Sequence, residues 1–568
     1  MATEAASAPS APRTLRLGRV APRLALVAFI GAVGYLTILP LARLQYLAFD
    51  DGFQTYRDAF SRPGAWTTVR WTIFLGVGSL LIALVVGTGL AWAASNLPRR
   101  LRWLRVLPIL PIILPPISAV LGWAFMLSPV PGYANQILRK LPWWSGSFEG
   151  PFDVYTLPWI IIITGLALAS FVYLFVSAGL ENINDELIEA AHVGGSSRIG
   201  VFFRVVLPLL RPALVYGAGV SLLLGLGQFT APLLLGRNEG INVLTTDMYF
   251  QTQLVPPQYG IAAAIGSPLL VFGVFILFVN RVLLGDHTRF ITHGGKGGFK
   301  PAARGSWTAA AAIISYGVVA TLLPIAALVL VSLSKFWTGS FDTSTWTLDS
   351  WREVASAQGV KPAIWNSVLL SVVAAAITLP ISYVAATVLR RRRDHRIIGP
   401  ILDFVVAMPL SIPAVIFGVG FLLTYTNEPF VLYGTRWVIV LVYVTLMLPF
   451  ATRMLLSGLA ALGESYSEAA RVSGAGPLRT HLSILVPLLR PTIGGATALM
   501  FVLLTHEFAA SLLVRSPDVQ VMGTVLYDYY ENGGYPLVAV ISLVMVGVTT
   551  AGVAVAVAIG GSEAFKRL

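Results

Sequence analysis

The sequence predicts an all-α integral membrane protein of about twelve transmembrane helices, arranged as two homologous six-helix halves. Three observations lead to this prediction. The chain is 568 residues long, 56% hydrophobic and only 11% charged, and so few charges could not cover the surface of a soluble protein. Twelve apolar stretches are each long enough to cross a bilayer, which takes about 20 helical residues. One polar pattern also occurs twice, 279 residues apart.

The expected elements follow one another in a simple order. Residues 1–20, rich in Ala, Ser, Pro and Arg, are expected to form a flexible tail. Residues 21–285 are expected to form the first half, 286–306 a basic, glycine-rich linker, and 307–568 the second half. Helices are expected throughout, because lipid requires internally paired backbone groups and the alternation of a barrel strand is absent. The expected spans are 21–43, 69–95, 104–127, 156–179, 213–235, 261–284, 307–334, 364–389, 400–425, 436–458, 492–514 and 535–560.

The positive charges indicate how the chain is oriented. The formal net charge is +13, and most Lys and Arg fall in alternate segments between the spans. Basic residues accumulate on the cytoplasmic side of membrane proteins, so both termini are predicted to be cytoplasmic. We therefore interpret the basic excess as a topology signal, and no nucleic acid is expected as a partner. The basic segments on the predicted inner side are 13–23, 99–105, 289–304, 390–396, 566–567 and the two copies of the polar pattern.

Several classes of site are excluded by composition. The chain has no cysteine, which excludes disulfides and thiolate chemistry. Its six His show no metal-ligand spacing, so neither a metal site nor a bound cofactor is expected. The single Gly-Lys pair, Gly295-Lys296, lacks the rest of a phosphate-binding loop. No catalytic triad or carboxylate pair is evident, so the chain is not expected to be an enzyme.

The repeated polar pattern lies between the fourth and fifth span of each half. Glu189-Ala190-Ala191 is followed by Gly195 and then by a hydrophobic run ending in Leu207-Pro208. Glu468-Ala469-Ala470 is followed by Gly474 and then by Val486-Pro487 at the same offsets. Each acidic, Ala-containing stretch is expected to form a short amphipathic helix. The glycine after it would permit a turn that residues with a Cβ resist.

This pattern resembles the EAA motif of the permeases of binding-protein-dependent ABC importers, and the resemblance covers about residues 60 to 560. It implies a type I importer fold in a bacterial inner membrane. It further implies that Glu189, Ala190, Ala191, Gly195, Glu468, Ala469, Ala470 and Gly474 contact a homodimer of ABC ATPase subunits. ATP and Mg²⁺ would then bind to that separate chain, and a solute-binding protein would dock on the outer loops 45–68, 129–155, 236–260, 335–362 and 516–534.

The repeat extends into the third and ninth spans. Gly122 is matched with Gly418, an offset of 296. Both spans are rich in proline, and matching broken helices in two halves often line a transport pathway, although a structural kink without solute contact is an equal alternative. The prolines are Pro108, Pro111, Pro115 and Pro116 in one span, and Pro409 and Pro413 in the other.

A few polar residues fall at membrane depth, where they are costly and often functional. Glu507, preceded by His506, is placed in the eleventh helix, and its repeat mate Gln228 is placed in the fifth. These three residues are candidates for the translocation pathway, with a hydrogen-bonded packing pair as the alternative. Arg453 has no charged repeat mate and is expected to extend its side chain to the inner interface.

The solute is indicated only by resemblance. Two permease halves fused in one chain resemble the ferric iron importer permeases, and fused thiamine and 2-aminoethylphosphonate permeases are similar. Stretches 229–236, 243–249, 507–513 and 535–539 resemble the iron group, which makes ferric iron the expected solute. Two other classes stay open: an ATP-independent secondary carrier, and a membrane scaffold that only holds an ATPase.

Overall fold

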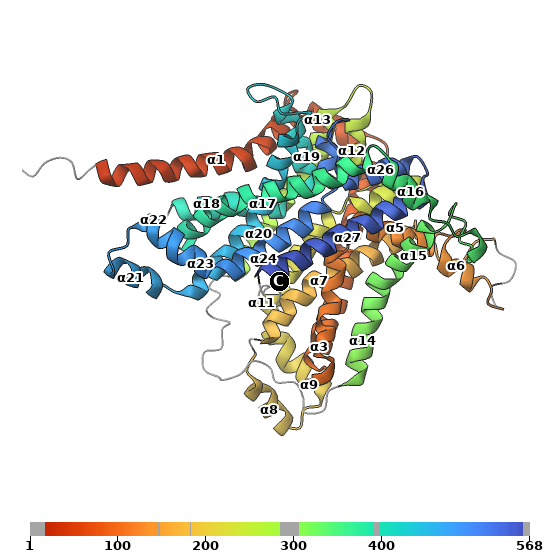
Figure 1. The fold of residues 1–568 in the computed structure, drawn as a ribbon, viewed down its shortest axis with the longest axis horizontal. Helices are drawn as coiled ribbons and strands as arrows, with labels where there is room; N and C mark the ends of the chain where they lie inside the picture. Colours follow the sequence, from red (N-terminus) through yellow and green to blue (C-terminus); the bar gives the residue numbers. More distant parts are fainter. Residues whose placement is uncertain are drawn as a thin grey trace, which may run out of the picture.

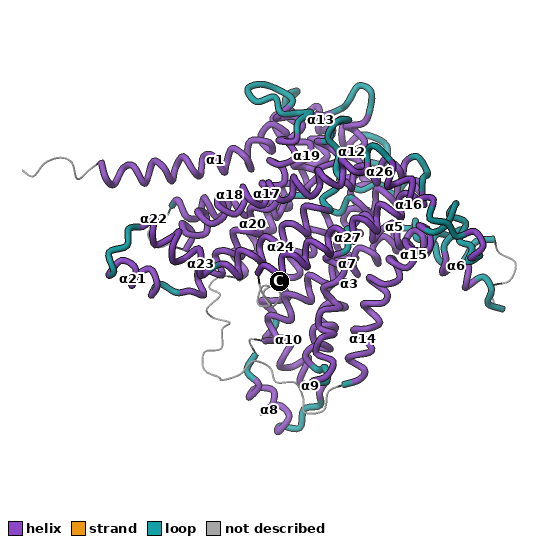
Figure 2. Tube along the Cα trace, in the orientation of Figure 1, coloured by secondary structure: helices purple, strands orange, loops and turns teal. Residues whose placement is uncertain are grey.

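The computed structural model of the chain describes residues 17–142, 144, 148–181, 183–284, 306–390 and 397–560. Within these ranges the chain is almost entirely helical (Figure 2) and forms no strand. The first helix begins at Leu17, so the predicted tail of 1–20 is too long at its C-terminal end. Its other residues, and the predicted linker 286–306 apart from Ser306, lie outside the described residues.

The predicted number of spans agrees with the helices observed. Eight described helices are long and apolar enough to cross a membrane alone, and four bent pairs would each cross as one span, which gives up to twelve. The first half contains α1 (Leu17–Ala48), α2 (Gln54–Ser61), α3 (Ala65–Ser95), η2 (Arg99–Ile109), α4 (Leu110–Ile113), α5 (Pro116–Leu127), α6 (Tyr133–Leu138), α7 (Leu157–Glu181), α8 (Asp185–Val193), α9 (Arg198–Val201), η3 (Phe202–Val206), α10 (Leu207–Leu209), α11 (Arg211–Leu226), η4 (Pro232–Gly236), η5 (Arg237–Glu239), α12 (Leu244–Gln253) and α13 (Tyr259–Leu284).

The second half repeats this order. It contains α14 (Trp307–Gly317), η7 (Val318–Leu322), α15 (Leu323–Ser332), η8 (Thr343–Thr345), α16 (Asp349–Ser356), α17 (Val360–Arg390), α18 (Ile398–Ser411), α19 (Ala414–Tyr425), α20 (Arg436–Leu462), α21 (Ser465–Val472), α22 (Pro477–Thr480), η9 (His481–Leu485), α23 (Val486–Leu488), α24 (Arg490–Thr505), α25 (Ala509–Val514), α26 (Met522–Glu531) and α27 (Tyr535–Gly560).

The third and ninth spans are broken at their prolines, as predicted. The first bends by 95° between Ile113 and Pro116, and the second by 108° between Ser411 and Ala414. The residues before the prolines, Leu114 and Ile412, have extended backbone. Proline causes this break because it disfavours helical backbone at the preceding residue and offers no N–H.

These breaks correct the predicted register of the repeat. Because Pro115 and Pro413 occupy the same place in the two bent spans, the offset there is 298. Gly122 therefore corresponds to Gly420, and its predicted match with Gly418 is wrong. The apolar residues around both glycines are too alike to fix a register, whereas the position of the break fixes it.

Each half is held to the other by its first helix. α1 packs on α18 and α19 of the second half, and α15 packs on α5 of the first. The corresponding glycines allow both contacts. A Cβ at Gly122 would lie 2.5 Å from the backbone oxygen of Pro324, and one at Gly420 would lie 2.8 Å from that of Pro40. The two halves are thus interlocked rather than merely adjacent.

The helices form two arms that diverge towards one end of the molecule (Figure 1). One arm contains α3, α7 and α14 and carries α8 at its tip, whereas the other contains α17, α18 and α20 and carries α21. At the opposite end, α12 and α26 lie together over the junction of the arms. We call the end with α8 and α21 the EAA end.

We predict that Gly122→Val destabilises the chain because the new side chain would overlap backbone of α15. Overpacking of this kind costs about 1–3 kcal/mol, which should lower the melting temperature of the purified chain in detergent. The matched control is Gly89→Val, since Gly89 has open space around its Cβ position. Equal melting temperatures for both variants would contradict the interlocked packing.

Candidate functional site

The two copies of the EAA pattern form the short helices α8 and α21, one at the tip of each arm (Figure 1). We call these the EAA helices. Glu189, Ala190, Glu468 and Ala469 are all exposed on them. Ala191 is partly buried and Ala470 is buried, so the second alanine of each pair faces its own arm. The first alanine and the glutamate are left on the accessible side.

The glycines end both EAA helices in the same way. Gly195 has φ +79° and Gly474 has φ +77°, a left-handed conformation that side chains with a Cβ rarely adopt. One residue later the chain bonds back to the helix: the N–H of Ser196 donates to the oxygen of Ala191, and that of Ala475 donates to Ala470. This paired pattern is the Schellman motif, and it explains the fixed spacing between the alanines and the glycine.

The EAA helices also present matching apolar side chains to their surroundings. Val193 and Val472, 279 residues apart, are both 90% exposed. Leu187 and Tyr466, at the same offset, are 42% and 46% exposed. Exposed apolar side chains grouped next to polar ones are typical of protein contact surfaces. The same small surface is therefore displayed twice, once on each arm.

Gln228, His506 and Glu507 do not lie within helices, contrary to the prediction. α11 ends at Leu226 and α24 ends at Thr505, so all three residues lie in the breaks that follow. The predicted spans 213–235 and 492–514 are too long because the apolar run continues into the separate segments η4 and α25. Hydropathy does not distinguish one straight helix from two segments with a break.

Glu507 caps the segment that follows it. Its carboxylate accepts hydrogen bonds from the N–H groups of Ala510 and Ser511, at 2.8 and 2.9 Å, and from the Ser511 hydroxyl at 2.5 Å. A carboxylate at a helix N-terminus satisfies amides that have no partner within the helix. The position that matches Ser511 in the first half is Pro232, which has no N–H.

Gln228 is consequently bonded in a different way. Its side-chain oxygen accepts from the neighbouring N–H of Phe229 at 3.1 Å, and its backbone oxygen accepts from Thr245 of α12 at 2.6 Å. The hydrogen bonds of Gln228 and Glu507 thus run within their own halves. His506 is buried, with 5% exposure. The structure brings these candidates to equivalent breaks without a direct bond between them.

The residues next to these candidates join the two halves. The rings of Phe229 and Phe508 lie 5.8 Å apart, centre to centre. Each packs on a tyrosine of its own half: Phe229 on Tyr249 and Phe508 on Tyr527, both at 5.6 Å. All four side chains are at most 6% exposed. We call these four residues the aromatic layer, and together they close the space between the halves at the end opposite the EAA helices.

An ion pair covers the aromatic layer. Arg237 of the first half contacts Glu531 of the second at 2.6 Å. Tyr530, beside Glu531, donates its hydroxyl to the backbone oxygen of Leu234 at 2.7 Å. Burial raises the pKa of Tyr249 and Tyr527, so both phenols of the layer are neutral here. Sequence reasoning missed this cluster because its members come from four separate segments.

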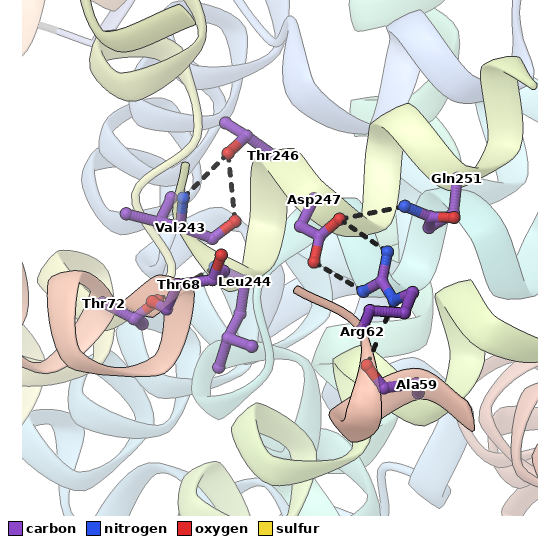
Figure 3. A network of polar contacts seen from close by, with 9 residues as sticks. All are labelled: Ala59, Arg62, Thr68, Thr72, Val243, Leu244, Thr246, Asp247 and Gln251. Carbon is purple, nitrogen blue, oxygen red and sulfur yellow. Dashed lines mark hydrogen bonds and ion pairs between the residues drawn. The ribbon is translucent and has the colours of Figure 1, made fainter. Parts of the chain in front are cut away.

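The helix that carries Tyr249 is firmly attached to the first half (Figure 3). Arg62 forms two hydrogen bonds with Asp247 of α12, at 3.3 and 2.8 Å. The N–H of Leu244 donates to Thr72 of α3 at 2.9 Å. In the second half the N–H of Met522 donates to Ser367 of α17 at 2.8 Å. Because α12 and α26 are each anchored to their own half, they would move with it.

Two further observations concern charge. Arg453 pairs with Asp403 of α18 at 2.8 Å, so its side chain is held by a neighbouring helix, whereas the sequence predicted only extension to the interface. Among the described residues, no three His, Cys, Asp or Glu side chains are grouped closely enough to hold a metal ion.

The arrangement has a counterpart among known proteins. The family model of the binding-protein-dependent transport system inner membrane component matches residues 80–285 and again residues 378–561. The chain belongs to this family. It is a permease of an ABC importer, with one permease unit in each half, and as a transport subunit it is not an enzyme.

Individual relatives resemble the chain over different lengths. The ferric transport system permease protein FbpB of Actinobacillus pleuropneumoniae is 25% identical over 475 residues, which are 82% of this chain and 67% of that protein. The probable ABC transporter permease protein y4fN of Sinorhizobium fredii is 25% identical over 562 residues, 94% and 95% of the two chains. The sulfoquinovosyl glycerol transport system permease protein SmoG of Agrobacterium fabrum is 30% identical over 236 residues, 38% of this chain and 75% of that one.

The cap formed by Glu507 leads to a testable asymmetry between the halves. We predict that Glu507→Ala lowers the free energy of unfolding by about 1–2 kcal/mol, because the amides of α25 lose their acceptor. Gln228→Ala is the matched control and should cost less than about 0.5 kcal/mol, since it removes only a bond to a neighbouring amide. Denaturant titration of the two purified variants measures both values, and equal losses would contradict the capping role.

Proposed function

We propose that this permease imports ferric iron across a bacterial inner membrane, driven by a separate ATPase and supplied by a solute-binding protein. The observation that carries the iron proposal is the extent of the resemblance. The relative named for ferric transport aligns with 82% of this chain, so the alignment must include parts of both permease halves. The stretches that resemble the iron group also supply Phe229, Tyr249 and Glu507, which lie in or beside the aromatic layer.

The EAA helices are the proposed contacts for the ATPase. Each offers an exposed glutamate beside exposed apolar side chains, and the two surfaces match in residue offset and in exposure. Two identical ATPase subunits require two such equivalent surfaces, one for each subunit. Glu189 and Glu468 would pair with a basic group of the ATPase. ATP and Mg²⁺ would bind on the ATPase, and this chain would bind no cofactor.

The proposed mechanism is alternating access between the two arms. Closure of the ATPase dimer on ATP would draw α8 and α21 together. Since α12 and α26 are anchored to opposite halves, the aromatic layer would part at the other end and admit the solute. Gln228, His506 and Glu507 would then border the path, because they adjoin Phe229 and Phe508. Hydrolysis would return the arms to the state described here.

This mechanism places the EAA end and both termini in the cytoplasm. The solute-binding protein would dock at the opposite end, on the outer loops that include α12, α16 and α26. The two halves differ there, which a single asymmetric binding protein requires. The proposed domain division at 286–306 separates α13 from α14 and would let each half move as a unit.

Another solute is the second candidate. The relative named for sulfoquinovosyl glycerol transport is 30% identical over one half-length stretch, so the permease fold itself does not select iron. Thiamine, 2-aminoethylphosphonate or another small polar solute would use the same architecture. A secondary carrier or a scaffold would leave the paired EAA helices or the aromatic layer without a purpose.

The decisive variant carries Glu189→Lys and Glu468→Lys together. We predict at least a tenfold loss of ATP-dependent uptake of labelled ferric iron, because each docking surface would present the wrong charge, a reversal that costs several kcal/mol at an interface. Added Lys on the cytoplasmic side agrees with the topology signal, so the amount of protein in the membrane should not change.

Uptake by cells that express the native ATPase and binding protein measures the effect. The paired Glu→Gln variant is the control, since it removes the charge without reversing it and should retain more uptake. Normal uptake by a well-expressed Lys variant would overturn the coupling role. Unchanged iron uptake on deletion of the chain, with loss of uptake of thiamine or aminoethylphosphonate, would move the solute to the second candidate.

A further inference from the structure

Three oxygen-bearing side chains meet directly above the phenylalanines of the aromatic layer. Tyr249 of α12 and Tyr527 of α26 interact through a side-chain hydrogen bond. Tyr527 also interacts with the carboxylate of Glu531, which lies four residues further along the same helix, on the same face. Two phenol groups and one carboxylate thus face one another across the boundary between the halves.

A guanidinium occupies this cluster in the closed state. Arg237 contacts Glu531 at 2.6 Å, and the two side chains are 46% and 39% exposed. Arg237 also lies over the ring of Phe250, 5.3 Å from its centre, which holds the cation on the side of the first half. Because Arg237 and Glu531 belong to different halves, separation of the halves would withdraw the guanidinium and leave the carboxylate free.

We propose that Tyr249, Tyr527 and Glu531 form a transit site for a hard trivalent cation at the outer mouth of the pathway, and that Arg237 fills it while the halves are closed. The inference rests on the proposed function, which identifies the cargo as ferric iron. It adds the residues that would first bind the cargo within the permease, and it gives the ion pair a role in keeping the site shut.

The ligand set fits such a cation. Small, highly charged cations prefer oxygen ligands, and all three side chains offer oxygen. Tyr527 and Glu531 remain together on one helical turn in any state, whereas Tyr249 completes the site from the opposite half. Each phenol that binds the cation releases its proton to water.

The site is also suited to brief occupancy. Three side chains leave the coordination of the cation incomplete, and the next residues inward, Phe229 and Phe508, offer no ligand atom. A pathway needs binding that is favourable enough for entry and weak enough for departure. A complete set of ligands would instead trap the cargo at the mouth.

The test uses the full assembly in lipid nanodiscs with an ATPase variant that binds ATP without hydrolysing it. Ferric citrate is titrated in, and binding is followed by the visible charge-transfer absorption of a phenolate–iron(III) bond. We expect this absorption in the ATP-held wild type. Arg237→Ala should show it at about tenfold lower iron concentration, since the competing cation is gone, and Tyr249→Phe/Tyr527→Phe should abolish it.

Tyr530→Phe is the matched control for loosening of the closed state. It removes one hydroxyl from the same helix and one bond between the halves, but none of the three proposed ligands, so the absorption should remain. Absorption that persists in Tyr249→Phe/Tyr527→Phe, or that is absent from both the ATP-held wild type and Arg237→Ala, would overturn the site.

Iron uptake measured in parallel separates this inference from the proposed function. Wild-type uptake of labelled iron, together with unchanged uptake and no absorption difference in Tyr249→Phe/Tyr527→Phe, would reject the site and leave iron import standing. Absence of iron uptake by the wild type, with its ATPase and binding protein active on another solute, would reject iron import and the site together.

Discussion

The contact between Phe229 and Phe508 is the point on which the two ends of this molecule depend. Each phenylalanine follows a broken helix of its own half and rests on a tyrosine from the next segment of that half. While the rings touch, the space between the halves is closed at one end and the arms diverge at the other (Figure 1). Any movement that brings the EAA helices together must act on this contact, because the halves have interlocked helices and share a single junction.

The breaks are what make such a junction possible within an apolar medium. A helix buried in lipid pairs all its backbone groups internally, so a break is tolerated only where other protein groups replace the lost bonds. Glu507 does this for α25 in the second half, and Thr245 accepts the same task for the backbone of Gln228 in the first. Proline at 232 explains why the two solutions differ. Near-identical architecture is therefore compatible with different chemistry on the two sides of the junction.

The sequence predicted the features that are governed by the surrounding medium or by backbone conformation. Hydropathy identified the spans because lipid selects apolar residues wherever a helix crosses it. The glycines at 195 and 474 and the prolines at 115 and 413 identified turns and breaks because only their backbones adopt or impose those conformations. The family followed from the spacing of the EAA residues.

Features that depend on distant neighbours were not accessible in this way. The ends of α11 and α24 were missed since the next segments are equally apolar. The pairing of Arg453 with Asp403, the register between Gly122 and Gly420 and the four members of the aromatic layer all depend on segments brought together by the fold. None leaves a local pattern in the sequence.

The central claim is that approach of the arms and parting of the aromatic layer are one movement. The chain has no cysteine, so pairs of cysteines can be introduced and spin-labelled without interference. One pair at Trp103 and Ile401, exposed at matching places on the two arms, reports on the EAA end, and one at Glu239 and Asn532 reports on the opposite end. On trapping the ATPase with ATP, the account predicts that the first distance shortens while the second lengthens. Shortening of the first distance with no change in the second would contradict it.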